Sequence, residues 1–98
     1  MNNFKILFLD NAYDFIDQLS EPDKAKILAN IKIMETDLGV VRIKLLGNHI
    51  RELIVKKYRL LFFIKNNTIF FIDGFIKKSQ KTPKREIEKA ENIYKSMK

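Results

Sequence analysis

The chain has 98 residues, 46% of them hydrophobic, which allows one domain (residues 1–98) with a single modest core. It contains no cysteine, and this excludes a disulfide framework, a thiolate metal site and a cysteine nucleophile. The formal net charge of +7 comes from residues 51–98, whose net charge is +8, whereas residues 1–50 have a net charge of −1. This asymmetry indicates a polyanionic partner, with nucleic acid favoured over an acidic protein segment, but it is equally consistent with a surface that is merely basic.

The N-terminal part predicts a strand and a helical hairpin. Residues 4–9 are typical of a strand, and the N-terminus lacks the pattern of a signal peptide. A first helix follows, with Asp10 or Asn11 as its N-cap, and a second begins at Ser20 and ends near Gly39. The apolar faces of the two helices are Ala12, Phe15, Ile16 and Leu19, and then Ile27, Ile31, Met34 and Leu38.

From residue 42 the pattern changes to strands. Four consecutive strands are expected at residues 42–46, 50–56, 58–65 and 68–76, joined by turns at 47–48, 56–57 and 66–67. Asn66 and Asn67 suit a tight hairpin because asparagine tolerates positive φ. Residues 60–64 and 69–72 are nearly continuous in apolar residues, so we expect central strands covered on both faces. Polar residues interrupt the apolar run of residues 60–76, so no membrane span is expected.

A final helix is expected to start with Thr82 as N-cap and Pro83 at the first helical position. Its apolar stripe consists of Ile87, Ala90, Tyr94 and Met97. The predicted fold class is therefore α+β, with an N-terminal strand, a helical hairpin, an antiparallel meander sheet and a C-terminal helix. A chain of this kind without cysteine or a membrane span is expected in the cytoplasm.

The sequence contains no recognisable motif for a cofactor or a metal. It has no P-loop, no glycine-rich dinucleotide turn and no pair of histidines at ligand spacing, so neither a cofactor nor a metal site is expected. The lone histidine, His49, is expected to be a solvated side chain in a turn. Asp73 ends an apolar strand beside Gly74, where we expect it to accept backbone N–H bonds rather than to orient a lysine.

Basic residues dominate the second half of the chain. Arg51 and Arg59 flank one turn region of the predicted meander, and we expect them to lie at the same end of the sheet. Lys77 and Lys78 end the last strand, close to Phe75. Cations with aromatic rings nearby are typical of a groove for single-stranded RNA. The further cations expected to bind RNA are Lys56, Lys57, Lys81, Lys84 and Arg85.

The same cluster is suited to cleaving RNA without a metal. In that reaction the 2′-hydroxyl attacks its own phosphodiester, while the protein aligns the groups, removes a proton and stabilises the developing negative charge. Arginine suits the stabilising role because its planar fork binds phosphate oxygens bidentately. A lysine acts as the base only when neighbouring cations lower its pKa. From spacing alone, simple phosphate binding or contact with an acidic protein segment stays open.

Two stretches carry a resemblance to a known family. Residues 52–63 (ELIVKKYRLLFF) and 73–83 (DGFIKKSQKTP) resemble the RelE/ParE toxin superfamily, and within it the HigB-like, phage Gp49-like branch. That branch shows Glu-Leu ahead of a Tyr-Arg strand start, and then Gly-Phe-x-Lys-Lys-x-x-Lys-Thr-Pro before a terminal helix. The matching region is residues 45–94. The KKSQKTP string is fairly specific, whereas Tyr-Arg alone is not.

The resemblance implies a RelE-like fold and a toxin of a type II toxin–antitoxin system that cleaves mRNA on the ribosome. It also implies neutralisation by a co-expressed antitoxin, often a helix-turn-helix protein of the HigA kind. By position, Arg59 matches the arginine expected to contact the scissile phosphate, and Lys77 and Lys78 match the basic pair near the active centre. Arg51 is a looser match, because it depends on the register of its strand.

The chain also departs from the branch. Ile54 stands where arginine is common, and Asp73 where histidine is common. Some relatives use a C-terminal His or Tyr for proton transfer, but Tyr94 lies in the predicted core stripe, so the proton-transfer residue is unassigned. Two other functions therefore stay open. One is a ParE-like poison of DNA gyrase, and the other is a remnant that binds an antitoxin without catalysis.

Overall fold

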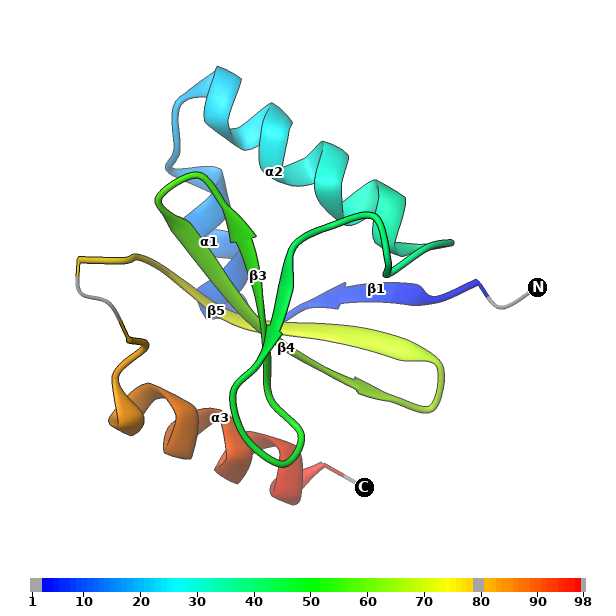
Figure 1. The fold of residues 1–98 in the computed structure, drawn as a ribbon, viewed down its shortest axis with the longest axis vertical. Helices are drawn as coiled ribbons and strands as arrows, with labels where there is room; N and C mark the ends of the chain where they lie inside the picture. Colours follow the sequence, from blue (N-terminus) through cyan, green and yellow to red (C-terminus); the bar gives the residue numbers. More distant parts are fainter. Residues whose placement is uncertain (1–2, 79–80, 98) are drawn as a thin grey trace.

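The computed structural model describes residues 3–78 and 81–97. The described residues form a five-stranded sheet with α1 and α2 on one face and α3 on the other (Figure 1). This arrangement confirms the predicted α+β class and the order of its elements. In chain order the elements are β1 (Lys5–Phe8), α1 (Asp10–Asp17), α2 (Glu21–Met34), β2 (Ile43–Leu45), β3 (Arg51–Val55), β4 (Tyr58–Lys65), β5 (Thr68–Ile76) and α3 (Lys84–Ser96).

The sheet is mixed rather than purely antiparallel. Its strand order is β1-β5-β4-β3-β2, in which β2 to β5 form the predicted meander and β1 lies parallel to β5. Asn66 and Asn67 have φ angles of 52° and 65°, so the hairpin between β4 and β5 is the predicted tight turn. Lys56, in the turn between β3 and β4, has a φ of 55°. Two short hairpins therefore join β3, β4 and β5, and the register of β4 against β5 shifts between Leu61 and Phe62.

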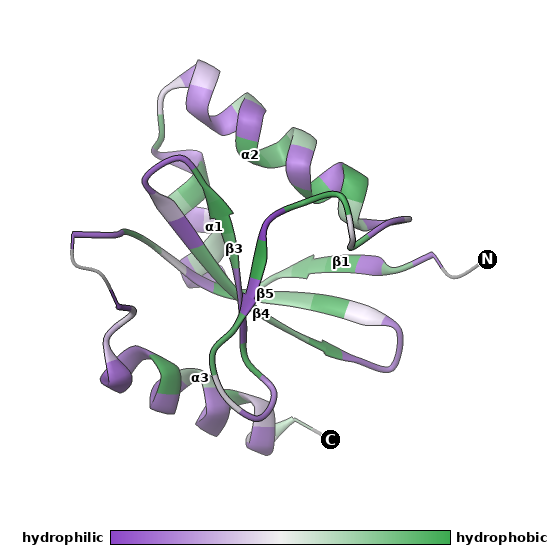
Figure 2. Cartoon of the chain, in the orientation of Figure 1, coloured by the Kyte–Doolittle hydropathy of each residue, from purple (hydrophilic) through white to green (hydrophobic). Residues whose placement is uncertain are grey.

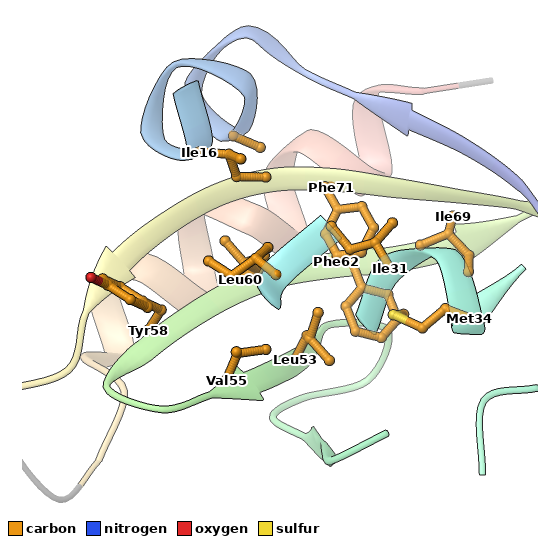
Figure 3. Packing of buried hydrophobic residues seen from close by; sticks show 12 residues of the cluster. Ile16, Ile31, Met34, Leu53, Val55, Tyr58, Leu60, Phe62, Ile69 and Phe71 are labelled. Atoms are coloured by element: carbon orange, nitrogen blue, oxygen red, sulfur yellow. The ribbon is translucent and has the colours of Figure 1, made fainter. Parts of the chain in front are cut away.

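Side chains of β4 divide between two apolar clusters. Tyr58, Leu60 and Phe62 point toward α1 and α2, whereas Leu61 and Phe63 point toward α3, as strand alternation requires. The first cluster is shown in Figure 3 and consists of Ala12, Ile16, Ile27, Ile31, Met34, Leu53, Val55, Tyr58, Leu60, Phe62, Ile69 and Phe71. The buried members of the second are Ile50, Leu61, Phe63, Ile72 and Ala90. The two faces of the sheet are called below the α1/α2 face and the α3 face.

Gly74 allows α1 to lie close to β5. A Cβ atom at this position would lie 2.3 Å from Cδ2 of Phe15 and 2.7 Å from Cδ2 of Leu60. Both distances are far below van der Waals contact, so a side chain here would force α1 away from the sheet.

For each of the first two helices, one boundary prediction was wrong. Leu9, not Asp10 or Asn11, is the N-cap of α1. The strand runs directly into the helix, because the Leu9 N–H donates to Phe71 while the Leu9 carbonyl accepts from Tyr13. Helix α2 ends at Met34 rather than near Gly39. Just beyond the end of the helix, the Glu35 carbonyl accepts the N–H of Phe4. No helix in residues 3–78 and 81–97 is long and apolar enough to cross a membrane.

Candidate functional site

Arg59 lies near the start of β4 on the α3 face. Its cross-strand neighbours are Ile54 on β3 and Phe75 on β5. One terminal nitrogen of the guanidinium, Nη1, donates to the carbonyl oxygens of Lys56 and Tyr58, both at 2.9 Å. The side chain is only 14% exposed. The arginine is therefore folded back against the turn that precedes it.

A buried carboxylate lies beside Arg59. Glu52 on β3 has no exposed surface, and its Oε2 lies 4.0 Å from the Nε of Arg59. These two atoms are buried and have no hydrogen-bond partner in the structure. The other carboxylate oxygen, Oε1, accepts a hydrogen bond from the hydroxyl of Thr82. Thr82 therefore does not cap α3 as predicted, since its hydroxyl is directed inward and Pro83 is the N-cap residue.

A hollow lined by basic side chains adjoins this group. It encloses about 200 Å³ and is lined by Phe75, Ile76, Lys77, Lys78, Lys81 and Pro83. Phe75 connects it to Arg59, its neighbour across the strands. The N–H of Lys77 donates to the Lys57 carbonyl at 2.9 Å, which fixes the chain just beyond β5 against the turn between β3 and β4. The structure thus brings Lys77, Lys78 and Lys81 to the end of the sheet that holds Arg59.

Hydrophilic residues gather around the same end. Figure 2 shows them on the turn between β3 and β4 and on the described parts of the segment that joins β5 to α3. Lys84 and Arg85, both exposed, form the start of α3. These two cations follow directly after Pro83, so they extend the basic surface along the first turn of α3.

Lys56 and Lys57 lie at the edge of this region. Lys56 pairs with Asp23 of α2 at 3.2 Å, and Lys57 lies over the Tyr58 ring, 5.7 Å from its centroid. The Tyr58 hydroxyl donates to Asp23 at 2.6 Å. That hydrogen bond lowers the pKa of Asp23, as do the hydrogen bond and charge of Lys56, against the opposing effect of burial. It also raises the pKa of Tyr58. These contacts tie α2 to the turn that Arg59 contacts.

The expectation that Arg51 lies at the same end of the sheet as Arg59 was wrong. Arg51 pairs with Phe62 at the far end of β3, whereas Arg59 pairs with Ile54 next to the turn. Strand alternation also places Arg51 on the α1/α2 face, where it lines a depression with Leu38, Gly39, Ile43 and Leu45. A phosphate held by Arg59 is therefore out of reach of Arg51.

His49 is exposed, as expected, but its side chain also has partners on α3 that were not predicted. Its Nδ1 lies 3.0 Å from Oε1 of Glu91 on α3, and its backbone N–H donates to Oε2 of the same carboxylate at 3.1 Å. The imidazole also stacks on Tyr94, with ring centroids 4.0 Å apart. Burial acts to raise the pKa of Glu91, but the hydrogen bonds and charge of His49, with a bond from the Asn48 backbone, outweigh it and lower the pKa.

Replacing Glu91 by glutamine is expected to lower the free energy of unfolding by about 1 kcal/mol at neutral pH, because a charged acceptor becomes a neutral one. The folded-state pKa of Glu91 lies below that of the unfolded chain. Its contribution is therefore fully present above about pH 4.3 and is lost as the pH falls through the folded-state value. Urea unfolding of both proteins at pH 7 and pH 3 measures the effect. A difference that is equal at both pH values contradicts it, and Glu88→Gln, on the exposed side of α3, is the control.

Asp73 accepts the N–H of Gly74 at 2.8 Å, as expected. Two other features of the site were missed from the sequence. The link from Glu52 to Thr82 was not anticipated, although Glu52 alternates with Ile50 and Ile54 and so falls on an apolar face of its strand. The pairing of His49 with Glu91 joins residues 42 positions apart and has no local signal.

Comparison with known proteins places the chain in a family. The family model of the phage-derived protein Gp49-like (DUF891) matches residues 14–95. A search of curated proteins gives no match. These results agree with the branch predicted from the two sequence stretches.

Solved structures show the same fold at low sequence identity. The archaeal RelE–RelB complex from Pyrococcus horikoshii OT3 contains a chain that matches with a TM-score of 0.67 and 11% identity, over 80% of this chain and 98% of that one. For the toxin–antitoxin complex RelBE2 from Mycobacterium tuberculosis the values are 0.65 and 16%, over 76% and 99%. For the RelB–RelE complex from Methanococcus jannaschii they are 0.63 and 15%, over 86% and 96%. The predicted RelE-like fold is confirmed.

Proposed function

The chain belongs to the phage-derived Gp49-like family, and on this premise we propose that it is the toxin of a toxin–antitoxin pair and cleaves mRNA on the ribosome. The observation that carries the proposal is the position of Arg59 at a hollow lined by Phe75 and three lysines. Cations that follow a phosphate backbone, with an aromatic ring for base stacking, are what single-stranded RNA requires. The RelE-like fold supports the proposal by analogy.

Arg59 is proposed to stabilise the transition state of cleavage. The 2′-hydroxyl attacks the neighbouring phosphorus, and negative charge develops on the phosphorane and on the leaving 5′-oxygen. Arginine stays protonated and presents parallel N–H donors to two phosphate oxygens. In the free protein, Nη1 of Arg59 is engaged with the carbonyls of Lys56 and Tyr58. To bind phosphate through Nη1, Arg59 exchanges these bonds for bonds to the scissile group.

The lysines are proposed to hold the RNA and the ribosome. Lys77, Lys78 and Lys81 line the hollow that adjoins the proposed phosphate site. Four further cations are proposed to contact the RNA backbone outside the reacting nucleotides. They are Lys56 and Lys57, in the turn between β3 and β4, and Lys84 and Arg85, at the start of α3. The residue that takes the proton from the 2′-hydroxyl is not assigned by this arrangement.

A co-expressed antitoxin is the second partner in the proposal. The solved structures of the same fold are complexes of RelE with RelB. A helix-turn-helix protein of the HigA kind is the partner that the resemblance implies. We propose that an acidic segment of the antitoxin occupies the basic hollow in the cytoplasm and so excludes RNA.

Replacing Lys77 and Lys78 together by alanine is expected to weaken binding of single-stranded RNA by at least tenfold at low salt. Each lost phosphate contact also reduces the slope of log K against log salt by about 0.7. Fluorescence anisotropy with a labelled single-stranded RNA at several salt concentrations measures both quantities. The matched control is the double variant Lys26→Ala and Lys32→Ala, which removes the same charge from the exposed side of α2. Equal losses in both double variants contradict a specific role for the hollow.

The proposal is tested with purified protein and ribosomes engaged on a defined mRNA. Cleavage within the translated frame, mapped by primer extension, is the expected result. The same mRNA without ribosomes is the control. A folded protein that arrests growth but leaves the mRNA intact in this assay refutes the proposal and favours a gyrase poison. A folded protein that neither arrests growth nor cleaves RNA favours a remnant that binds an antitoxin.

A further inference from the structure

Glu52 is a buried charge that the proposed chemistry does not use. Its carboxylate has no exposed surface, and Oε2 has no hydrogen-bond partner in the structure. A buried, incompletely paired carboxylate is costly, and a buried ion pair that is replaced as a whole by apolar side chains of similar volume is often equally stable or more stable. Stability of the fold alone therefore does not account for the pair of Glu52 and Arg59.

The position of the orphan oxygen indicates what the carboxylate is for. Oε2 lies 4.0 Å from the Nε of Arg59, which is also buried and without a partner. The two atoms face each other at a distance about 1 Å longer than a charge-assisted hydrogen bond. A shift of the Arg59 guanidinium by about 1 Å toward Glu52 would close this gap. Such a shift is compatible with the release of Nη1 from the carbonyls of Lys56 and Tyr58.

The other oxygen of Glu52 extends the link to the basic segment. Oε1 accepts from the hydroxyl of Thr82, which is buried and directly follows Lys81. Glu52 thus connects β3 both to Arg59 and to the end of the segment that leads into α3. One carboxylate joins two parts of the site that lie 23 residues apart in sequence, at positions 59 and 82.

We propose that Glu52 is a positioning residue, whose buried carboxylate holds the Arg59 guanidinium through Nε and anchors the lysine-bearing segment through Thr82. The part of this inference that concerns cleavage rests on the proposed function. With Nε bonded to Glu52, the terminal nitrogens of Arg59 are presented to the scissile phosphate in a fixed plane. Glu52 itself does not touch the RNA.

Glu52→Gln separates the two contacts. The amide oxygen of glutamine still accepts from Thr82, but its NH₂ group then faces Arg59 Nε, donor against donor. Because a misplaced catalytic group costs about 10²-fold in rate for a displacement near 1 Å, we expect single-turnover cleavage to fall about 10- to 100-fold. The affinity for single-stranded RNA is expected to change less than twofold. Glu88→Gln, on the exposed side of α3, is the matched control.

A double-mutant cycle distinguishes positioning from a general structural role. If Glu52 acts through Arg59, then Glu52→Gln causes no further loss of cleavage, within twofold, in a protein that already carries Arg59→Ala. The same cycle in urea unfolding is expected to show that Glu52→Gln destabilises the Arg59→Ala protein less than it destabilises the wild type. Equal effects of Glu52→Gln in both backgrounds, on cleavage and on stability, overturn the proposal.

A spectroscopic measurement tests the same link independently of cleavage. In ¹⁵N NMR spectra the Arg59 Nε–H signal is expected to exchange slowly with solvent in the wild type, and at least tenfold faster in Glu52→Gln. An unchanged signal and exchange rate overturn the pairing. A wild type that does not cleave mRNA, but whose Arg59 signal responds to Glu52→Gln, refutes the proposed function and supports the pairing. If Glu52→Gln does not fold, Thr82→Val removes the second contact and is expected to shift the same signal.

Discussion

Alanine at position 59 is expected to slow ribosome-dependent cleavage of mRNA by about 100- to 1,000-fold, the usual effect of removing one donor that stabilises a transition-state anion. Arg59 is the cation placed on the α3 face between Ile54 and Phe75, beside the hollow that Lys77 and Lys78 line. Single-turnover assays with purified protein and programmed ribosomes measure the rate. Arg59→Lys is expected to recover only part of it, because an ammonium group lacks the planar fork of arginine.

The matched control for this variant is Arg42→Ala. Arg42 is exposed and precedes β2, and its backbone carbonyl, which accepts from Ile54, is retained in the variant. Circular dichroism of both variants shows that the fold is kept. A cleavage rate for Arg59→Ala within tenfold of the wild type, or an equal loss in Arg42→Ala, contradicts the catalytic role of Arg59.

Truncation of Phe62 to alanine is expected to lower the free energy of unfolding by about 3–5 kcal/mol. Phe62 has no exposed surface and packs against Phe71 with ring centroids 5.3 Å apart, at the centre of the cluster below α1 and α2 (Figure 3). A domain of this size is stable by only about 5–15 kcal/mol, so the variant loses a large share of its stability. Urea unfolding at neutral pH measures the change.

Tyr13→Ala is the control for the core variant. Tyr13 is 58% exposed on α1, so the loss of its ring is expected to change stability by less than about 0.5 kcal/mol. Comparable losses for Phe62→Ala and Tyr13→Ala would contradict the assignment of Phe62 to the core.

The order of elements could be predicted because each element carries its own periodicity. The spacing of Ile27, Ile31 and Met34 identifies α2, and the pair Asn66-Asn67 identifies the hairpin between β4 and β5. The place of β1 in the sheet could not be predicted. Its parallel pairing with β5 joins residues more than 60 positions apart, and no local pattern encodes it.

The site was predicted in part. The turn at Lys56-Lys57 placed Arg59 correctly at one end of the sheet, but the same turn pairs Val55 with Tyr58 and so carries Arg51 to the far end of β3. Counting outward from the turn would have shown this. The link between Glu52 and Thr82 depends on how the segment before α3 folds back over the sheet, and a sequence pattern does not determine that path.

The most direct test of the proposed activity is to map mRNA 5′ ends in cells after the chain is induced from a tightly repressed promoter, with Arg59→Ala expressed in parallel. Cleavage on the ribosome predicts new ends at codon-spaced positions within translated frames, and predicts that Arg59→Ala does not produce them. Growth arrest by the wild type without new 5′ ends would contradict mRNA cleavage as the function of this protein.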